Sequence, residues 1–187
     1  VPRDISSAAF FVAAALLLPN SEILIEQVGL NPGRRAILDV LIKMGASIEI
    51  FQQKETFGEL IGDLRVNSSN LKGGSLTGSL IPKIIDEVPV LAILATQTHN
   101  GITIRDAGEL RVKESDRIQT LVHNLRIMGA RVEEYSDGMS IPGQQILKGG
   151  TVNSHGDHRI AMAFAVAGLI ALGPTYIKNG NCTEVSF

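Results

Sequence analysis

The sequence predicts an α/β fold assembled from a repeated unit. The apolar pattern of residues 36–46 returns at residues 120–130, with Met44 and Met128 in corresponding places 84 residues apart. In both copies the spacing is that of an amphipathic helix, a glycine ends the helix, and an alternating strand follows. Because a chain of 187 residues can bury one substantial core and its apolar residues are spread evenly, we expect one domain over residues 1–187.

The elements follow one another in the same order in each unit. An apolar helix and a short strand precede each amphipathic helix, and a further strand comes after the alternating one. A third unit begins near residue 160 and contains only its first helix and strand, so we expect it to be truncated. The expected helices are residues 8–18, 36–46, 88–94, 120–130 and 160–172, and the expected strands are residues 23–26, 47–50, 102–105, 131–134 and 175–178.

Two double glycines, Gly73-Gly74 and Gly149-Gly150, stand in matching segments that read as a turn leading into a strand. A glycine-rich phosphate loop is the competing interpretation. Neither segment has the spacing of a P-loop, and no G-x-G-x-x-G sequence precedes a helix. We therefore expect no nucleotide to bind here.

Composition excludes several classes of function. Seventeen basic and nineteen acidic residues give a net charge of -2, which argues against a nucleic-acid or membrane surface but is compatible with a local anion pocket. The single cysteine, Cys182, excludes an internal disulfide and a cysteine-based zinc cage, which favours a reducing, cytoplasmic location. The apolar stretches at residues 8–18 and 160–172 are too short to span a membrane.

Residues 111–117 place five charged side chains before an amphipathic helix. The spacing puts Lys113 and Arg117 one helical turn apart with Glu114 beside them, so that these groups could converge on an anionic ligand. A solvated helix start is the alternative. In a second cluster, Arg159 is held at the head of the apolar segment 160–169, where the helix dipole favours anions.

Carboxylates and histidines next to these arginines leave other interpretations open. Salt bridges to Asp116 or Asp157 are the structural alternative for both arginines. Asp86 precedes the apolar helix at residues 88–94, where it would cap the helix and could also accept a proton. His155 and His158 lack a third ligand at suitable spacing, so we expect no metal and no cofactor.

The segments Arg111 to Arg117, Asp157 to Arg159 and Ile85 to Pro89 resemble signatures of the EPSP synthase (3-phosphoshikimate 1-carboxyvinyltransferase) family, with Ser115 in place of a threonine. The opening residues 4–10 are also similar to the start of that family's C-terminal lobe. The resemblance covers nearly the whole chain. It implies that residues 1–187 are the C-terminal lobe of a two-lobed enzyme, a fragment whose N-terminal lobe is missing.

The resemblance also implies the arrangement of the units and the chemistry. The units would form an inside-out α/β barrel around a pseudo-threefold axis, with helices buried and sheets outside. The activity would be transfer of the enolpyruvyl group from phosphoenolpyruvate to the 5-hydroxyl of shikimate 3-phosphate, with release of phosphate, in the shikimate pathway of aromatic amino acid biosynthesis. By this resemblance, Asp86 would accept a proton and Glu114 would donate one. Asp86 and Lys113 would bind shikimate 3-phosphate, and Arg117 and Arg159 would bind phosphoenolpyruvate. Asp157 and His158 would support Arg159.

Two departures put individual contacts in question. Glu109 stands where some members have a substrate-binding asparagine, and Val185 where some have a phosphoenolpyruvate-binding lysine. The expected partners are the two substrates and the missing lobe, with no nucleic acid and no membrane, and the protein is expected to be monomeric. We expect the fragment to be a half-site that is inactive alone. The alternatives are a lobe of UDP-N-acetylglucosamine 1-carboxyvinyltransferase and a non-catalytic ligand-binding lobe.

Overall fold

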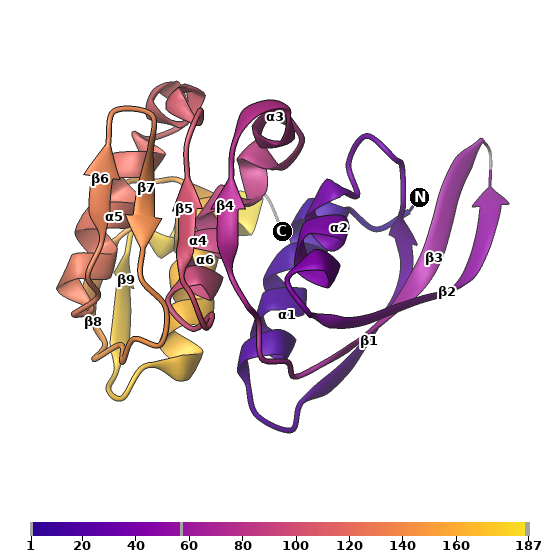
Figure 1. Cartoon of the computed structure of the whole chain (residues 1–187), viewed down its shortest axis with the longest axis horizontal. Helices are drawn as coiled ribbons and strands as arrows, with labels where there is room; N and C mark the ends of the chain where they lie inside the picture. Colours follow the sequence, from indigo (N-terminus) through magenta and orange to yellow (C-terminus); the bar gives the residue numbers. More distant parts are fainter. Residues whose placement is uncertain (1, 57, 186–187) are drawn as a thin grey trace.

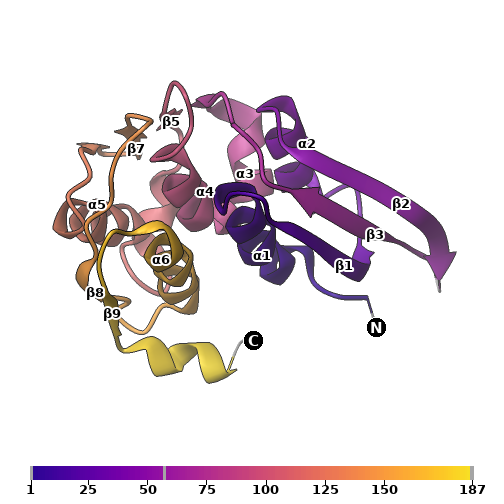
Figure 2. The ribbon, with the colours of Figure 1, turned by 90° about the horizontal axis from the view of Figure 1, so that it is seen from below.

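The computed structural model describes residues 2–56 and 58–185, without the side chain of Val185. Its centre is formed by the helices α1 (Ile5–Leu17), α4 (Val88–Ala95) and α6 (His158–Ile170), which pack against one another. The strands lie outside these helices (Figures 1 and 2). Helices that are apolar on all sides are stable only when buried, and every residue of α4 is buried. The expected inside-out α/β arrangement is confirmed.

The repeated unit is present, with one strand more than the expected helix, strand, helix, strand, strand. Each of the first two units runs helix, strand, helix and three strands, and in the described residues the third unit holds α6 and β9. The remaining elements are α2 (Ala36–Lys43), α3 (Ile81–Ile84), α5 (Arg117–Ile127), β1 (Glu22–Gly29), β2 (Ser47–Thr56), β3 (Glu59–Asn67), β4 (Gly74–Leu76), β5 (Ile102–Ile104), β6 (Glu133–Tyr135), β7 (Gly138–Ile141), β8 (Gly150–Asn153) and β9 (Thr175–Lys178), with 3-10 turns η1 (Gly78–Leu80), η2 (Ile85–Glu87), η3 (Gly108–Val112) and η4 (Gly180–Val185).

The sheets join one unit to the next. Strand order is β1-β3-β2 in the first sheet, β4-β5-β7-β6 in the second and β8-β9 in the third. The last strand of each complete unit pairs in parallel with the first strand of the following unit, β4 with β5 and β8 with β9. The other pairings are antiparallel. The sequence repeat and the sheets therefore have different boundaries.

The double glycines begin these shared strands and are turns, as predicted. Gly73 and Gly149 have φ of 82° and 80°, and the glycines that follow them have φ of 147° and 146°. These are values that side-chain-bearing residues rarely adopt. A Cβ on Gly73 would also lie 2.1 Å from the carbonyl oxygen of Gly101, so glycine is needed for close backbone approach as well.

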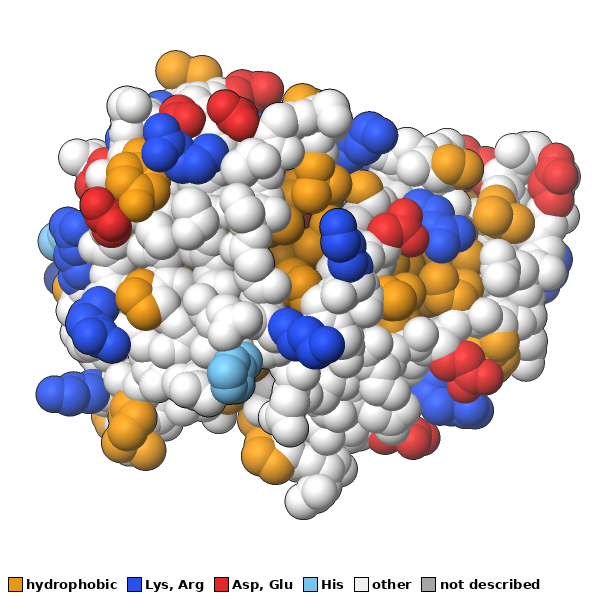
Figure 3. Space-filling model, in the orientation of Figure 1, with side chains coloured by type: hydrophobic (Ala, Val, Ile, Leu, Met, Phe, Trp, Pro, Cys, Tyr) orange, Lys and Arg blue, Asp and Glu red, His pale blue; other side chains and the backbone are white. Residues whose placement is uncertain are grey.

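Apolar side chains are visible in a groove between α2 and β4 (Figure 3), whose lining includes Val40, Met44 and Leu80. Over the described residues, the structure contains no helix with the length and apolar character needed to cross a membrane.

Candidate active site

Arg117, the first residue of α5, is the centre of a buried ionic network. Its side chain is 1% exposed. Its Nε donates to Asp157 at 2.7 Å, one terminal nitrogen donates to Asp86 at 3.2 Å, and the other donates to Glu114 at 2.5 Å. All three nitrogens of the guanidinium are thus bonded within the chain. The salt bridge to Asp157 that the sequence offered as an alternative is present, together with two further carboxylates.

The charge of Arg117 is stabilised by this setting. Burial alone lowers the pKa of the guanidinium, but the hydrogen bonds and charges of Asp157, Glu114 and Asp86 outweigh burial, and the pKa is raised. Asp86 and Glu114, the two predicted proton-transfer groups, are therefore held on the two terminal nitrogens of one guanidinium. Their side chains remain 44% and 53% exposed, so both can reach a ligand.

Asp157 connects the network to α6. The carboxylate is fully buried and caps the helix by accepting from the backbone N–H groups of Arg159 and Ile160. It also accepts from the Ser115 hydroxyl at 3.2 Å. Asp157, expected to orient Arg159, contacts that residue through its backbone N–H, whereas the side-chain partner of its carboxylate among the arginines is Arg117.

Arg159 approaches the same carboxylate from the first turn of α6. One terminal nitrogen, Nη1, donates to the backbone carbonyl of Asp86 at 3.0 Å and lies 3.7 Å from Glu87, and the other, Nη2, lies 3.8 Å from the Asp86 carboxylate. The side chain is 14% exposed. Among the described residues, Nη2 and Nε of Arg159 make no hydrogen bond. The two arginines therefore converge on Asp86, but only Arg159 keeps unused donors.

Two local expectations from the sequence are wrong. Asp86 does not cap α4, because it lies in the 3-10 turn η2 and its carboxylate is held by arginines. The cap position is Glu87, whose side chain makes no hydrogen bond to the backbone of the helix. Lys113 and Arg117 do not lie one helical turn apart, because α5 begins at Arg117 and Lys113 has extended backbone at the end of η3.

Lys113 pairs with one of the residues that depart from the family pattern. Its ammonium lies 2.6 Å from the Glu109 carboxylate, and neither group contacts the arginine network. The Glu109 side chain is 61% exposed, so this ion pair lies at the surface and contributes little stability. The structure therefore brings Asp86, Glu114, Arg117 and Arg159 together and leaves Lys113 at the edge.

Arg111, the first charged residue of the motif, stabilises the loop that contains Lys113 and Glu114. Its guanidinium donates to the carboxylates of Asp116 and Glu134 and to the carbonyls of Tyr135 and Ser136, at 2.7 to 3.0 Å. The hydrogen bond that Arg111 donates to Glu134 is the main cause that raises the pKa of Arg111. The motif thus combines a structural arginine and a site arginine, which the sequence alone does not separate.

The histidines and the cysteine have no metal-binding arrangement. No group of three or more His, Cys, Asp or Glu side chains in the described part of the chain could hold a metal ion. The His158 ring has no hydrogen-bond partner among the described residues, so its expected support of Arg159 has no contact behind it. Cys182 lies in η4, 3.8 Å from the Ser154 hydroxyl.

Sequence reasoning missed Glu87 and Ser6. Glu87 is 4% exposed, and its carboxylate accepts from the Ser6 hydroxyl at 2.5 Å. A small pocket of about 130 Å³ borders Ser6, Asp86 and Glu87, with Arg34 and Lys83 also in its lining. The available signal was a second carboxylate directly before a helix that is entirely apolar.

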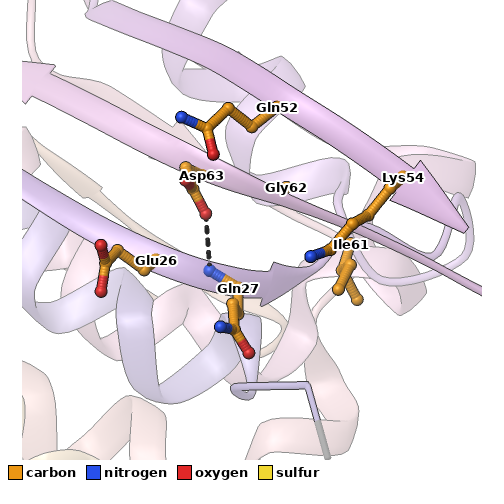
Figure 4. A pocket seen from close by; sticks show the side chains of 7 residues that line it. All are labelled: Glu26, Gln27, Gln52, Lys54, Ile61, Gly62 and Asp63. Carbon is orange, nitrogen blue, oxygen red and sulfur yellow. Dashed lines mark hydrogen bonds between the residues drawn. The ribbon is translucent and has the colours of Figure 1, made fainter. Parts of the chain in front are cut away.

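Another polar pocket, of about 120 Å³, lies apart from the arginine network on the sheet of the first unit (Figure 4). Bulges in β1 and β2 place Gln27 and Gln52 in the left-handed conformation, with φ of 56° and 49°. The Gln27 N–H donates to Asp63 at 2.8 Å. The strand bulges account for this hollow.

Comparisons with known proteins agree over the whole chain. The sequence profile of the family described as EPSP synthase (3-phosphoshikimate 1-carboxyvinyltransferase) matches residues 1–187. The 3-phosphoshikimate 1-carboxyvinyltransferases of Solibacter usitatus and Desulforudis audaxviator are 55% and 51% identical over all of this chain, which covers 44% of each relative. The chain thus spans less than half the length of the curated relatives it matches.

Solved structures give the same result. EPSP synthase from Acinetobacter baumannii superimposes with a TM-score of 0.96 at 39% identity, over all of this chain and 44% of that one. The enolpyruvyl transferase NikO from Streptomyces tendae has a TM-score of 0.80 at 18% identity, over all of this chain and 41% of that one, which shows the shared fold alone. Because the family profile matches all 187 residues and these relatives are similar over the whole chain, the chain belongs to the EPSP synthase family.

Proposed function

We propose that residues 1–187 form the C-terminal lobe of a two-lobed enzyme that transfers the 1-carboxyvinyl group of phosphoenolpyruvate to the 5-hydroxyl of shikimate 3-phosphate and releases phosphate. The observation that carries this proposal is the convergence of Arg117 and Arg159 on Asp86, with Glu114 on the opposite side of the Arg117 guanidinium. Family membership supports the same reaction.

Arg159 supplies the anion-binding part of the proposal. Its Nη2 and Nε, which make no hydrogen bond within the described residues, form one edge of a planar fork that matches the two oxygens of a carboxylate or phosphate. The residue also lies in the first turn of α6, where backbone N–H groups and the helix dipole favour an anion. Phosphoenolpyruvate carries both a carboxylate and a phosphate.

Charge balance supports a site shared between two lobes. In the network described here, the guanidinium groups of Arg117 and Arg159 face the carboxylates of Asp86, Glu87, Glu114 and Asp157. Negative charge therefore exceeds positive charge before any ligand arrives. Two anionic substrates would need further cations, which we assign to the N-terminal lobe of the same enzyme across the cleft.

Asp86 and Glu114 would carry the protons. Asp86 would accept the proton of the attacking 5-hydroxyl, and Glu114 would donate a proton to the methylene carbon of phosphoenolpyruvate. The Arg117 guanidinium holds one oxygen of each carboxylate and leaves both side chains about half exposed, so the two groups act from fixed positions. Lys113 would bind shikimate 3-phosphate after release from Glu109.

The test is a chimaera in which this chain replaces the matching segment of the Solibacter usitatus relative. We expect the chimaera to release phosphate from phosphoenolpyruvate only with shikimate 3-phosphate, and the isolated chain to release none, because orientation and desolvation need both lobes. NMR titration of the isolated chain with each substrate would show which ligand the lobe binds alone.

Two outcomes would contradict the proposal. A chimaera that folds but acts on UDP-N-acetylglucosamine would assign the lobe to the related transferase, and a folded chimaera without any turnover would leave it a binding lobe. We also propose that the enzyme is cytoplasmic, in keeping with the single cysteine of these 187 residues, and that it is a monomer. Sedimentation of the chimaera tests the monomer.

A further inference from the structure

Glu87 differs from its neighbour Asp86 in its surroundings. Its side chain is 6% exposed, against 44% for Asp86. A buried carboxylate is costly unless it has partners, and none of the proposed chemical steps uses this one. Glu87 therefore requires a separate explanation.

The contacts of Glu87 join the first and third units. From α1, the Ser6 hydroxyl donates to Oε1 at 2.5 Å, and Ser6 is itself buried. From α6, Arg159 places Nη1 3.7 Å from the same oxygen. The other charged groups that act on Glu87 are Asp86 beside it and Asp4 before α1. Glu87 thus lies where the ends of α1, α4 and α6 meet.

These contacts fix one edge of Arg159. Nη1 faces the backbone carbonyl of Asp86 and the Glu87 carboxylate, both on the same side of the guanidinium. The opposite edge, formed by Nη2 and Nε, has no hydrogen bond among the described residues. A long side chain that is anchored at one edge loses less rotamer entropy when an anion binds at the other.

We propose that Glu87, held by Ser6, is a positioning residue that anchors the Nη1 edge of Arg159 and so keeps its other edge open for the anionic substrate. The inference rests on the proposed function. Burial raises the pKa of Glu87, while the Ser6 hydrogen bond and the Arg159 charge oppose this effect. The retained pairing with two partners agrees with an anchoring role.

The experiment measures both KM values and kcat in the chimaera described above. Glu87→Ala should raise the KM for phosphoenolpyruvate about 10-fold, with kcat and the KM for shikimate 3-phosphate within about 2-fold. Glu87→Gln keeps the size and can still accept from Ser6, so it should raise this KM less than alanine does.

The Ser6 variants test the same proposal even if the Glu87→Ala variant does not fold. Ser6→Ala should raise the KM for phosphoenolpyruvate about 3-fold, and Ser6→Thr should restore it because the hydroxyl returns. Ser7→Ala is the matched control, since Ser7 occupies the next position of α1 and bonds Asp4 instead of Glu87.

Each result decides between the proposals. An unchanged or lowered KM for phosphoenolpyruvate in folded Glu87→Ala and Ser6→Ala variants overturns the positioning role, and a lowered KM would show that Glu87 competes with the substrate for Arg159. Absence of turnover in the chimaera that carries the unmodified chain is a different result, because it rejects the proposed function itself.

Discussion

Arg117 and Arg159 both lie in the first turn of a helix, α5 and α6 respectively, yet their guanidinium groups have different surroundings. Arg117 is fully buried and donates from all three nitrogens to Asp157, Asp86 and Glu114. Arg159 is partly open and donates from one nitrogen to a backbone carbonyl. The same residue type at the same kind of helix start therefore organises carboxylates in one case and offers donors to a ligand in the other.

The comparison divides the roles expected of the two arginines. Arg117 would contact a substrate only if Asp86 or Glu114 gave up its hydrogen bond, whereas Nη2 and Nε of Arg159 have no hydrogen bond to give up, Nη2 having only the 3.8 Å ion pair to Asp86. We therefore expect substitutions of Arg117 to change stability most and substitutions of Arg159 to change ligand binding most.

The largest effect is expected for Arg117→Ala, measured as the free energy of unfolding of this chain in denaturant. The change leaves the buried Asp157 carboxylate without its cation, and breaking a buried pair in this way costs about 3–5 kcal/mol. Arg159→Ala is the matched control and should cost less, since its carboxylate partners Glu87 and Asp86 lie 3.7 and 3.8 Å away, beyond hydrogen-bond distance, and Glu87 keeps the Ser6 hydrogen bond. Equal losses for the two variants would remove the distinction.

For ligand binding, the substitution of Arg159 should have a larger effect than the substitution of Arg117. Arg159→Ala in the chimaera should weaken phosphoenolpyruvate binding by about 2–5 kcal/mol, roughly 30-fold or more in Kd, because a charge-assisted contact to a desolvated anion is lost. Arg159→Lys should recover little, since lysine lacks the planar fork. Calorimetric titration measures this, and normal binding by Arg159→Ala would make that arginine structural.

Next come the two carboxylates that Arg117 holds. Asp86→Asn and Glu114→Gln should each lower kcat by about 10²- to 10⁴-fold while phosphoenolpyruvate binding is largely retained, because each removes a proton-transfer group and keeps its shape. Steady-state kinetics with calorimetry separates the two quantities. Near-normal kcat in both variants would reduce these residues to partners of Arg117.

The smallest effect is a dependence of stability on pH. Burial raises the pKa of Glu87 above its ordinary value of 4.5, so this group contributes stability that is present below about pH 4.5 and is lost as pH rises through the folded-state pKa. Glu87→Gln removes the titrating group. The stability of the unmodified chain relative to Glu87→Gln should therefore fall as pH rises from about 4.5 to neutral, and a constant or rising difference in denaturant unfolding would contradict this.

Sequence patterns predicted those features that depend on neighbouring residues. The 84-residue repeat, the all-apolar helices around Leu91 and Phe164, and the turns at Gly73 and Gly149 follow from local periodicity and backbone conformation, and the structure confirms them. The family motifs also predicted that Asp86 and the two arginines belong to one site.

Features that depend on distant partners could not be predicted in the same way. Asp86 looked like a helix cap because local spacing allows it, but Arg117, 31 residues away, holds its carboxylate instead. Sequence offered a salt bridge from Asp157 to either arginine, and only the fold shows that its carboxylate pairs with the guanidinium of Arg117, 40 positions back. The burial of Glu87 depends on Ser6, 81 residues earlier, which no spacing rule connects to it.

The parallel pairing of β4 with β5 and of β8 with β9 has a consequence for cooperativity. Backbone amides in such a strand are protected by hydrogen bonds to the following unit, so opening one unit must also expose an edge of the next. We therefore expect the amides of β4 to exchange hydrogen at the rate of the second sheet rather than that of β3. A linear array of repeats can unfold progressively from its end. Units whose last strand is hydrogen-bonded into the sheet of the next unit unfold together.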